Sequence, residues 1–287
     1  MNLSMTGDLA ADYHSGAQRA RVVTESWGAS NLYCPNCSSP KLTSLEPGHP
    51  ANDYRCPSCE FWFQLKSQKS RIGDFITDGA YTAMMNAIRH DETPSFYFMQ
   101  YEISGRDATP RRPRIGRAAL PRSLAEQQLG PTNETIWTVR NLLLVPSFAF
   151  PPSAIIKRNP LSSTARRAGW VGCNFALNRI PGSARIPVVN EGTISPPSQV
   201  REQYHLARKQ VEGLTVKQRG WRLDVLRVIQ SLGKAEFTTT DAYIFERELE
   251  QLHPDNRNIK AKIRQQLQEL RDRNLLLHID RNRWRLP

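Results

Sequence analysis

The stretch Asp53-Tyr-Arg-Cys-Pro-Ser-Cys-Glu-Phe-Trp-Phe-Gln-Leu-Lys66 contains an acidic residue, a CxxC pair and an alternating run of side chains within fourteen residues. Successive side chains of a β-strand point to opposite faces, so Gln64 and Lys66 are predicted to project together. A carboxylate from Asp53 at the neighbouring sheet edge would meet them. The order Asp, ten residues, Gln-x-Lys is the layout of a metal-dependent phosphodiesterase, in which two oxygen ligands hold Mg²⁺ and a lysine orients or activates water. A surface strand with polar residues on one side is the alternative.

Four of the five cysteines form two CxxC pairs, Cys34 with Cys37 and Cys56 with Cys59, with eighteen residues between the pairs. This spacing is typical of a four-cysteine zinc ribbon, in which each knuckle presents two thiolates to one Zn²⁺. Four thiolates leave no open coordination position, so the zinc is expected to be structural. Two unrelated pairs of free thiols are the alternative. The remaining Cys173 is expected to be a small packing residue.

The chain of 287 residues is long enough for two domains. Its 39 Lys and Arg against 27 Asp and Glu give a net charge of +12 and a pI near 9.8, which favours a polyanionic partner, nucleic acid first. No apolar run approaches the roughly 18 residues of a membrane span, and the N-terminus lacks the pattern of a signal peptide. We therefore expect a soluble, cytoplasmic, prokaryotic protein without a membrane partner.

Hydrophobic patterning predicts an α/β fold for the N-terminal domain, residues 1–200. Helices are expected at 15–27 and 77–88, the second capped by Thr77 or Asp78, and strands at 95–101 and 139–146 join the Phe61 strand in a mixed sheet. A proline- and arginine-rich insertion is expected at about 104–134.

A long acid-free segment lies between Glu134 and Glu191 and is typical of a surface that faces phosphates. Within it, Arg166, Arg167 and Trp170 combine charge with an indole, and such groups hold a DNA backbone and wedge or stack a base. Burial of Trp170 in the core is the alternative.

The C-terminal domain, residues 201–287, reads as three helices followed by a short hairpin, which is a winged helix. The helices are expected at 220–232, 238–252 and 257–273, the second opened by a Thr238 to Asp241 capping box, and the hairpin strands at 275–279 and 283–286. In this fold the third helix enters the major groove. Gln pairs well with adenine and Arg with guanine. The expected DNA-facing residues are Lys260, Arg264, Gln265, Gln266, Gln268 and Arg271. A merely solvated helix face is the alternative.

The chain resembles the DpnI-type restriction endonucleases over nearly its whole length except the insertion, and several segments carry the resemblance. They are Tyr33-Cys-Pro-Asn-Cys37, Gln64-Leu-Lys-Ser67, Asp78-Gly-Ala-Tyr81, Pro160-Leu-Ser-Ser-Thr-Ala-Arg-Arg-Ala-Gly-Trp-Val-Gly-Cys-Asn174, Arg219-Gly-Trp221 and Ile263-Arg-Gln-Gln-Leu-Gln-Glu-Leu-Arg-Asp272. The resemblance implies a PD-(D/E)XK nuclease core with an embedded zinc site, followed by a winged helix. It also implies Mg²⁺-dependent cleavage of double-stranded DNA at GATC when the adenines carry N6-methyl groups. Carried over, Asp53, Gln64 and Lys66 form the active site, Asp53 and Gln64 hold Mg²⁺, and Trp170 disturbs the base stack. We expect a monomer in solution.

Position 64 departs from the family pattern, which has Glu where this chain has Gln64. An amide oxygen still offers a ligand to Mg²⁺, but the site loses one negative charge and should bind the ion less tightly. A natural Gln-x-Lys nuclease, a substitution made to trap uncut DNA, and a reader that has lost cleavage are all compatible with this residue. We favour a nuclease because Asp53 and Lys66 stay in register. The competing functions are a non-cleaving reader of methylated adenine and a general DNA binder insensitive to methylation.

Overall fold

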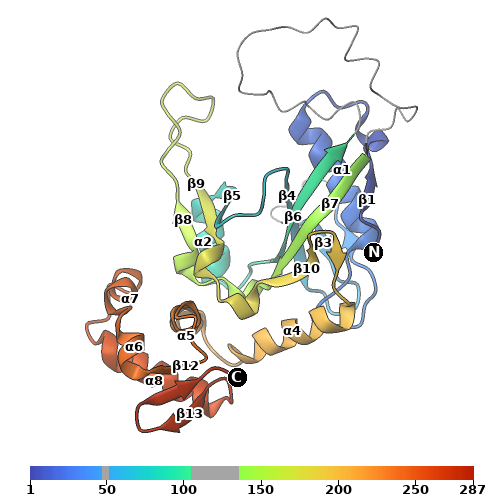
Figure 1. Ribbon diagram of the computed structural model, residues 1–287. Coiled ribbons are helices and arrows are strands. Elements are labelled where there is room, and N and C mark those ends of the chain that lie inside the picture. The colour runs from blue at the N-terminus through green and yellow to red at the C-terminus, as the bar shows by residue number, and fades with distance from the viewer. Residues whose placement is uncertain (47–51, 105–135) are drawn as a thin grey trace, which may run out of the picture.

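The computed structural model describes residues 1–46, 52–104 and 136–287, so most of the insertion expected at about 104–134 lies outside the described residues. A mixed sheet forms the centre of the N-terminal region (Figure 1). Its long strands β6 (Ser95–Ser104) and β7 (Ile136–Val145) pair antiparallel, and β4 (Trp62–Gln68) pairs parallel with β6. The strands expected at 95–101 and 139–146 are confirmed.

The strand order of this sheet is β11-β10-β7-β6-β4-β3-β2, and β1 adds to β7. The shorter strands are β1 (Ser4–Thr6), β2 (Thr43–Ser44), β3 (Tyr54–Arg55), β10 (Ile186–Asn190) and β11 (Thr193–Ile194). Short 3-10 helices lie at η1 (Gly7–Ala10), η2 (Ser147–Ala149), η3 (Pro152–Ala154), η4 (Leu177–Arg179) and η5 (Gly182–Ala184).

Helix α1 (Gly16–Asn31) covers one face of the sheet and runs one turn further than the helix expected at 15–27. Its Val23 and Trp27 are buried, as the sequence pattern predicts. Tyr54 of β3 donates from its hydroxyl to the Glu25 backbone oxygen at 2.8 Å. A Cβ on Gly28 would lie 2.2 Å from that hydroxyl, so glycine is required for this close approach of β3 to α1. The contact also positions Asp53, the residue before Tyr54.

A second, three-stranded sheet packs on the opposite face of β6. It has the order β5-β9-β8 and consists of β5 (Phe75–Ala80), β9 (Gly172–Ala176) and β8 (Ile155–Lys157). Aromatic rings join the two sheets, with centroid distances of 4.7 to 5.7 Å in a cluster made by Phe96, Phe98, Phe150 and Phe175. Such aromatic pairs bury large apolar surfaces in a defined geometry, so the second sheet is held firmly against the first.

The helix expected at 77–88 begins later than predicted. Residues 75–80 are the strand β5, and α2 (Tyr81–Arg89) starts only after Ala80, so Thr77 and Asp78 do not cap it. Pairing of β5 with β9 overrides the local capping signal, because the backbone groups of this segment bond to a strand almost a hundred residues away. Met84 and Ile88 face inward, as expected.

Helix α4 (Pro197–Lys209) belongs to the N-terminal core. Its buried Val200, Tyr204 and Ala207 pack into the same apolar cluster as the central sheet. This core therefore extends past residue 200, where the sequence pattern places the domain boundary.

The C-terminal region has its own apolar core and the helices and strands of a winged helix. They are α5 (Val216–Ser231), β12 (Glu236–Thr238), α6 (Thr239–Tyr243), α7 (Glu246–Leu252), α8 (Ile259–Asp272), β13 (Leu277–Asp280) and β14 (Arg283–Arg285). The predicted Thr238 to Asp241 capping box is present. The helix expected at 238–252 is divided into α6 and α7, and β12 adds a third strand to the predicted hairpin.

Helix α5 joins the two regions. The Ser153 hydroxyl donates to Asp224 at 2.6 Å, and Arg219 pairs with Asp91 at 2.5 Å. Within the described ranges, none of the helices is long and apolar enough to cross a membrane.

Candidate active site and metal centre

The four paired cysteines converge on one point. Their Sγ atoms all lie within 4.8 Å of one another, and Cys34–Cys59 and Cys37–Cys56 are each 3.5 Å apart. All four are free thiols. Four sulfur ligands at these separations fit one tetrahedral metal ion, and Zn²⁺ is the ion that such a set selects. The predicted four-cysteine cluster is therefore present in the fold and could hold Zn²⁺, and its closed ligand set suits a structural ion.

Arg201 of α4 holds the backbone of the first CxxC knuckle, a role that no local sequence pattern indicates. Its Nε donates to the backbone oxygens of Cys34 and Cys37 at 3.1 and 2.9 Å, and its guanidinium lies 5.2 Å from the ring centre of Tyr33. The contact spans more than 160 residues. Local patterning shows α4 only as a polar helix, so no sequence signal indicated the contact.

Gln64 and Lys66 share a face of β4, as the alternation predicts. Both line a cavity of about 780 Å³ that continues past Asp78 and along α2 to Asp91 and Glu92. Phe63 and Leu65, which alternate with them, are buried on the face toward α1. The cavity is large enough for a nucleotide-sized group, since ligand pockets are typically a few hundred Å³ or more.

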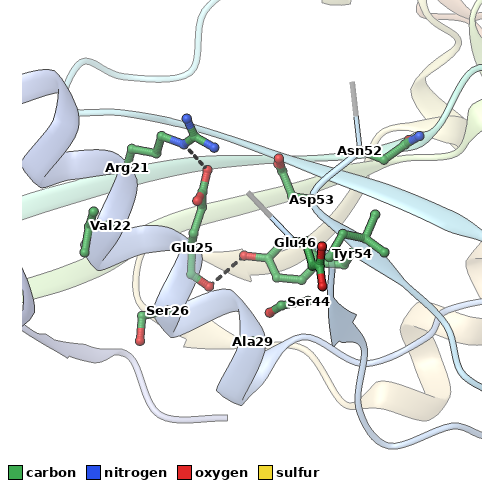
Figure 2. Close-up of a pocket in the computed structure, with 11 residues that line it drawn as sticks. Arg21, Val22, Glu25, Ser26, Ala29, Ser44, Glu46, Asn52, Asp53 and Tyr54 are labelled. Atoms are coloured by element: carbon green, nitrogen blue, oxygen red, sulfur yellow. Dashed lines mark hydrogen bonds and ion pairs between the residues drawn. The ribbon is translucent and has the colours of Figure 1, made fainter. Parts of the chain in front are cut away.

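Asp53 faces a neighbouring pocket of about 250 Å³ between α1 and β3. Figure 2 shows its carboxylate beside the Arg21–Glu25 ion pair. Its Oδ2 accepts a hydrogen bond from the backbone N–H of Leu65 at 2.8 Å, which ties it to β4 between Gln64 and Lys66. Asp53 is thus bonded to the β4 segment that carries Gln64 and Lys66. Its carboxylate lines one hollow, whereas the Gln64 and Lys66 side chains line another, and the two hollows share Asn52.

The surroundings of Asp53 disfavour its ionised form. Burial raises the pKa of the Asp53 carboxyl, and the negative charge of Glu25 raises it further, while the Leu65 hydrogen bond, Lys66 and Arg21 act in the opposite direction. A carboxylate that is costly to ionise in a pocket is typical of functional sites. A divalent cation would remove this cost. Glu25, the partner of Arg21, is half-buried and lines the same pocket as Asp53.

Lys66 is paired with Asp78, a residue that the local sequence pattern predicts as a helix cap. Its Nζ lies 2.6 Å from Asp78 Oδ1. The signal that could have indicated Asp78 was its place in the Asp78-Gly-Ala-Tyr81 segment, one of those that carry the family resemblance.

The β8–β9 connection extends away from the two sheets (Figure 1). Arg166 and Arg167 are exposed on it, and Trp170 is half-buried with the Arg167 guanidinium 4.5 Å from its ring centre. A Cβ on Gly172 would lie 2.8 Å from the Trp170 ring, so the glycine lets the indole pack against the base of the loop. Trp170 is therefore outside the apolar core, which favours the role expected from the sequence.

Helix α8 exposes most of the residues predicted to face DNA. Its stripe of Ile259, Ile263, Leu267 and Leu270 is buried, as predicted. Exposed on the helix are Lys260, Arg264, Gln265, Gln268 and Arg271. Arg264 donates to the Tyr243 hydroxyl at 2.8 Å, and Gln265 donates to Glu269 at 2.8 Å.

The expectation that Gln266 faces DNA is wrong. It is 2% exposed, and its Oε1 accepts a hydrogen bond from Arg222 Nε at 2.8 Å. Arg222 is itself buried and also pairs with Glu269. A buried guanidinium needs such partners, and this requirement turns Gln266 inward although it lies beside the exposed Gln265.

A mixed α/β region with a four-cysteine cluster that could bind zinc, followed by a winged helix whose helix α8 has a basic exposed face, defines a DNA-binding protein. Residues 1–107 and 132–212 match the DpnI family model, described as the Dam-replacing family, and residues 217–285 match DpnI_C, described as the Dam-replacing HTH domain. The chain belongs to this DpnI, or Dam-replacing, family. Membership supports a restriction-type, methylation-dependent DNA-binding function.

Proposed function

We propose that the protein is a type II endonuclease of the PD-(D/E)XK class that cuts double-stranded DNA at GATC carrying N6-methyladenine, with Mg²⁺ as cofactor. The observation that carries the proposal is the tie between Asp53 and β4. The Asp53 carboxylate bonds to the backbone between Gln64 and Lys66, so a carboxylate, an amide oxygen and an ammonium surround one short segment. These are the groups that metal-assisted phosphodiester hydrolysis requires.

The donor atoms of the site suit the expected ion, but in this structure Asp53 lines a different hollow from Gln64. Asp53 and Gln64 would hold Mg²⁺ through oxygen atoms, the ligand type that this ion prefers. When bound, the ion supplies Lewis acidity to a phosphoryl oxygen and to water. The Lys66 ammonium lies in the same cavity as Gln64, where it would orient the attacking water and offset charge on the scissile phosphate.

Two surfaces would hold the substrate. The exposed arginines of the β8–β9 connection would contact phosphates, and Trp170 would stack on or wedge between bases beside the cleavage site. Lys260, Arg264, Gln265 and Arg271 of α8 would reach the major groove. Both surfaces are basic, as expected for a partner recognised largely through its phosphates.

Digestion of plasmids that differ only in adenine methylation tests the proposal. The purified protein with Mg²⁺ or Mn²⁺ is expected to cut the methylated plasmid and leave the unmethylated one intact. If neither the wild type nor Gln64→Glu cuts, the nuclease proposal fails. Methylation-dependent gel shifts without cleavage would then identify a reader, the alternative that Gln64 favours, and gel shifts insensitive to methylation would identify a general DNA binder.

Replacing Gln64 by Glu is expected to strengthen Mg²⁺ binding. The added carboxylate restores the negative charge that the family pattern has at position 64, so half-maximal cleavage should need a Mg²⁺ concentration lower by about tenfold or more. The measurements are cleavage rate against Mg²⁺ concentration and calorimetric Mg²⁺ binding without DNA. Gln68→Glu adds the same charge to the end of the same strand and serves as the control. Equal Mg²⁺ dependence in wild type and Gln64→Glu would exclude Gln64 as a ligand.

A further inference from the structure

The Lys66 ammonium is held by a carboxylate that belongs to a different sheet. Lys66 lies on β4 of the central sheet, and Asp78 lies on β5 of the second sheet. Their charged atoms are 2.6 Å apart, and the side chains are 26% and 8% exposed, respectively. Ion pairs on open surfaces are weak because water and salt screen them, but a pair withdrawn from solvent is screened much less. Asp78 therefore constrains where the ammonium lies.

Asp78 lies at a β-bulge of β5. The register of β5 against β9 shifts within Thr77–Ala80, and two residues of β5, Asp78 and Gly79, oppose the single residue Cys173 of β9. A bulge bends its strand and re-aims a side chain, and bulges are over-represented next to active sites. Ile76, two residues earlier on β5, is buried, so alternation places Asp78 on the same face of the strand, which packs on the central sheet.

Cys173 of the neighbouring strand β9 packs against the bulge. Cys173 is fully buried, and its Sγ lies 3.6 Å from the Gly79 backbone oxygen and 4.0 Å from Asp78 Oδ2. The Phe96 and Phe175 rings, with centroids 4.7 Å apart, hold β9 against the central sheet in the same region. The carboxylate is thus supported by its own sheet before it contacts Lys66, as required of a group that orients another one.

We propose that Asp78 is the positioning residue for Lys66 in DNA cleavage. It holds the ammonium in the cavity beside Gln64, so that the lysine is already oriented when the scissile phosphate and the attacking water bind. Asp78 acts through Lys66 and makes no contact of its own with the reacting atoms. The inference rests on the proposed function, since it concerns the rate of the cleavage reaction.

The test is the Asp78→Asn variant in steady-state cleavage of methylated duplex. A displaced lysine should lower kcat on the order of 100-fold. KM and the DNA affinity measured with Ca²⁺ should stay unchanged, because the Asp78 carboxylate is only 8% exposed and is paired with Lys66. Asp78→Glu keeps the carboxylate and should recover part of kcat. Asp74→Asn removes an exposed carboxylate just before β5 and should cut at the wild-type rate.

The possible outcomes separate the inference from the proposed function. A wild type that cuts no methylated DNA refutes both. A wild type that cuts and an Asp78→Asn variant with equal kcat refute the inference alone. Unfolding of both Asp78 variants in a melting curve, or no recovery by Asp78→Glu, would assign Asp78 a structural role and overturn the inference. Faster cleavage by Asp78→Asn would also overturn it, because the contact would then restrain the lysine from its working position.

Discussion

Replacing Lys66 by methionine is expected to abolish DNA cleavage while binding to methylated duplex persists. Methionine keeps most of the volume of the lysine stem but removes the ammonium, the group in the cavity that would orient water and offset phosphate charge. Proton-transfer and positioning groups of this kind contribute about 10²- to 10⁴-fold to rate. The measurement is the single-turnover rate with Mg²⁺, beside the DNA affinity with Ca²⁺.

The ion pair with Asp78 complicates this variant, and a second substitution resolves the complication. Without Lys66, the Asp78 carboxylate, which is 8% exposed, loses its counter-ion. Removing one partner of a buried ion pair typically destabilises a protein by about 3–5 kcal/mol. Lys66→Met combined with Asp78→Asn removes both charges and should recover the melting temperature.

The double variant should recover stability and remain inactive. If it cleaves at the wild-type rate, Lys66 has no catalytic role. If Lys66→Met and the double variant both lose DNA binding in parallel with activity, the lysine is a structural or DNA-binding residue and the active-site assignment falls.

Loss of the metal from the four-cysteine centre is expected to unfold the N-terminal region. Apparent binding free energies of structural zinc are about 10–16 kcal/mol in zinc-finger peptides, whereas whole domains are stable by only about 5–15 kcal/mol. The Cys56 knuckle lies between β3 and β4, so its collapse would also release Asp53 and the β4 segment beside it. Cys56→Ser, or a strong chelator, should therefore remove both the cooperative melting transition and any cleavage.

Zinc content and thermal unfolding by circular dichroism check this prediction. One zinc per chain is expected in the wild type and less in Cys56→Ser. Cys173→Ala changes a cysteine that lies outside the metal cluster, so it should keep the full zinc content. An unchanged melting curve after chelation, or a wild type that purifies without metal and still folds, would refute a structural zinc site.

Short-range patterns predicted the features that depend on neighbouring residues. The two CxxC pairs indicated the metal centre because a knuckle places two thiolates within four residues. Strict alternation put Gln64 and Lys66 on one face of β4, and helical spacing identified the buried stripe of α8. These relations follow from backbone periodicity, which any stretch of strand or helix carries in its own sequence.

Patterns of the same kind failed where a distant partner competed. Pairing with β9 made a strand of the segment that carries Thr77 and Asp78, and the buried Arg222 turned Gln266 inward. In both cases a hydrogen-bonding requirement from another part of the fold outweighed a local preference.

By itself, then, the sequence determined the α/β and winged-helix architecture, the metal-binding cysteines and the shared face of Gln64 and Lys66. Tertiary structure alone decided that Asp53 faces α1, that Asp78 holds Lys66, and that Arg201 braces the metal centre. The physical reason is the distance along the chain between the residues that interact. Periodicity is set by a residue and its neighbours, whereas charge pairing and burial are set by whichever distant segments the packed core brings into contact.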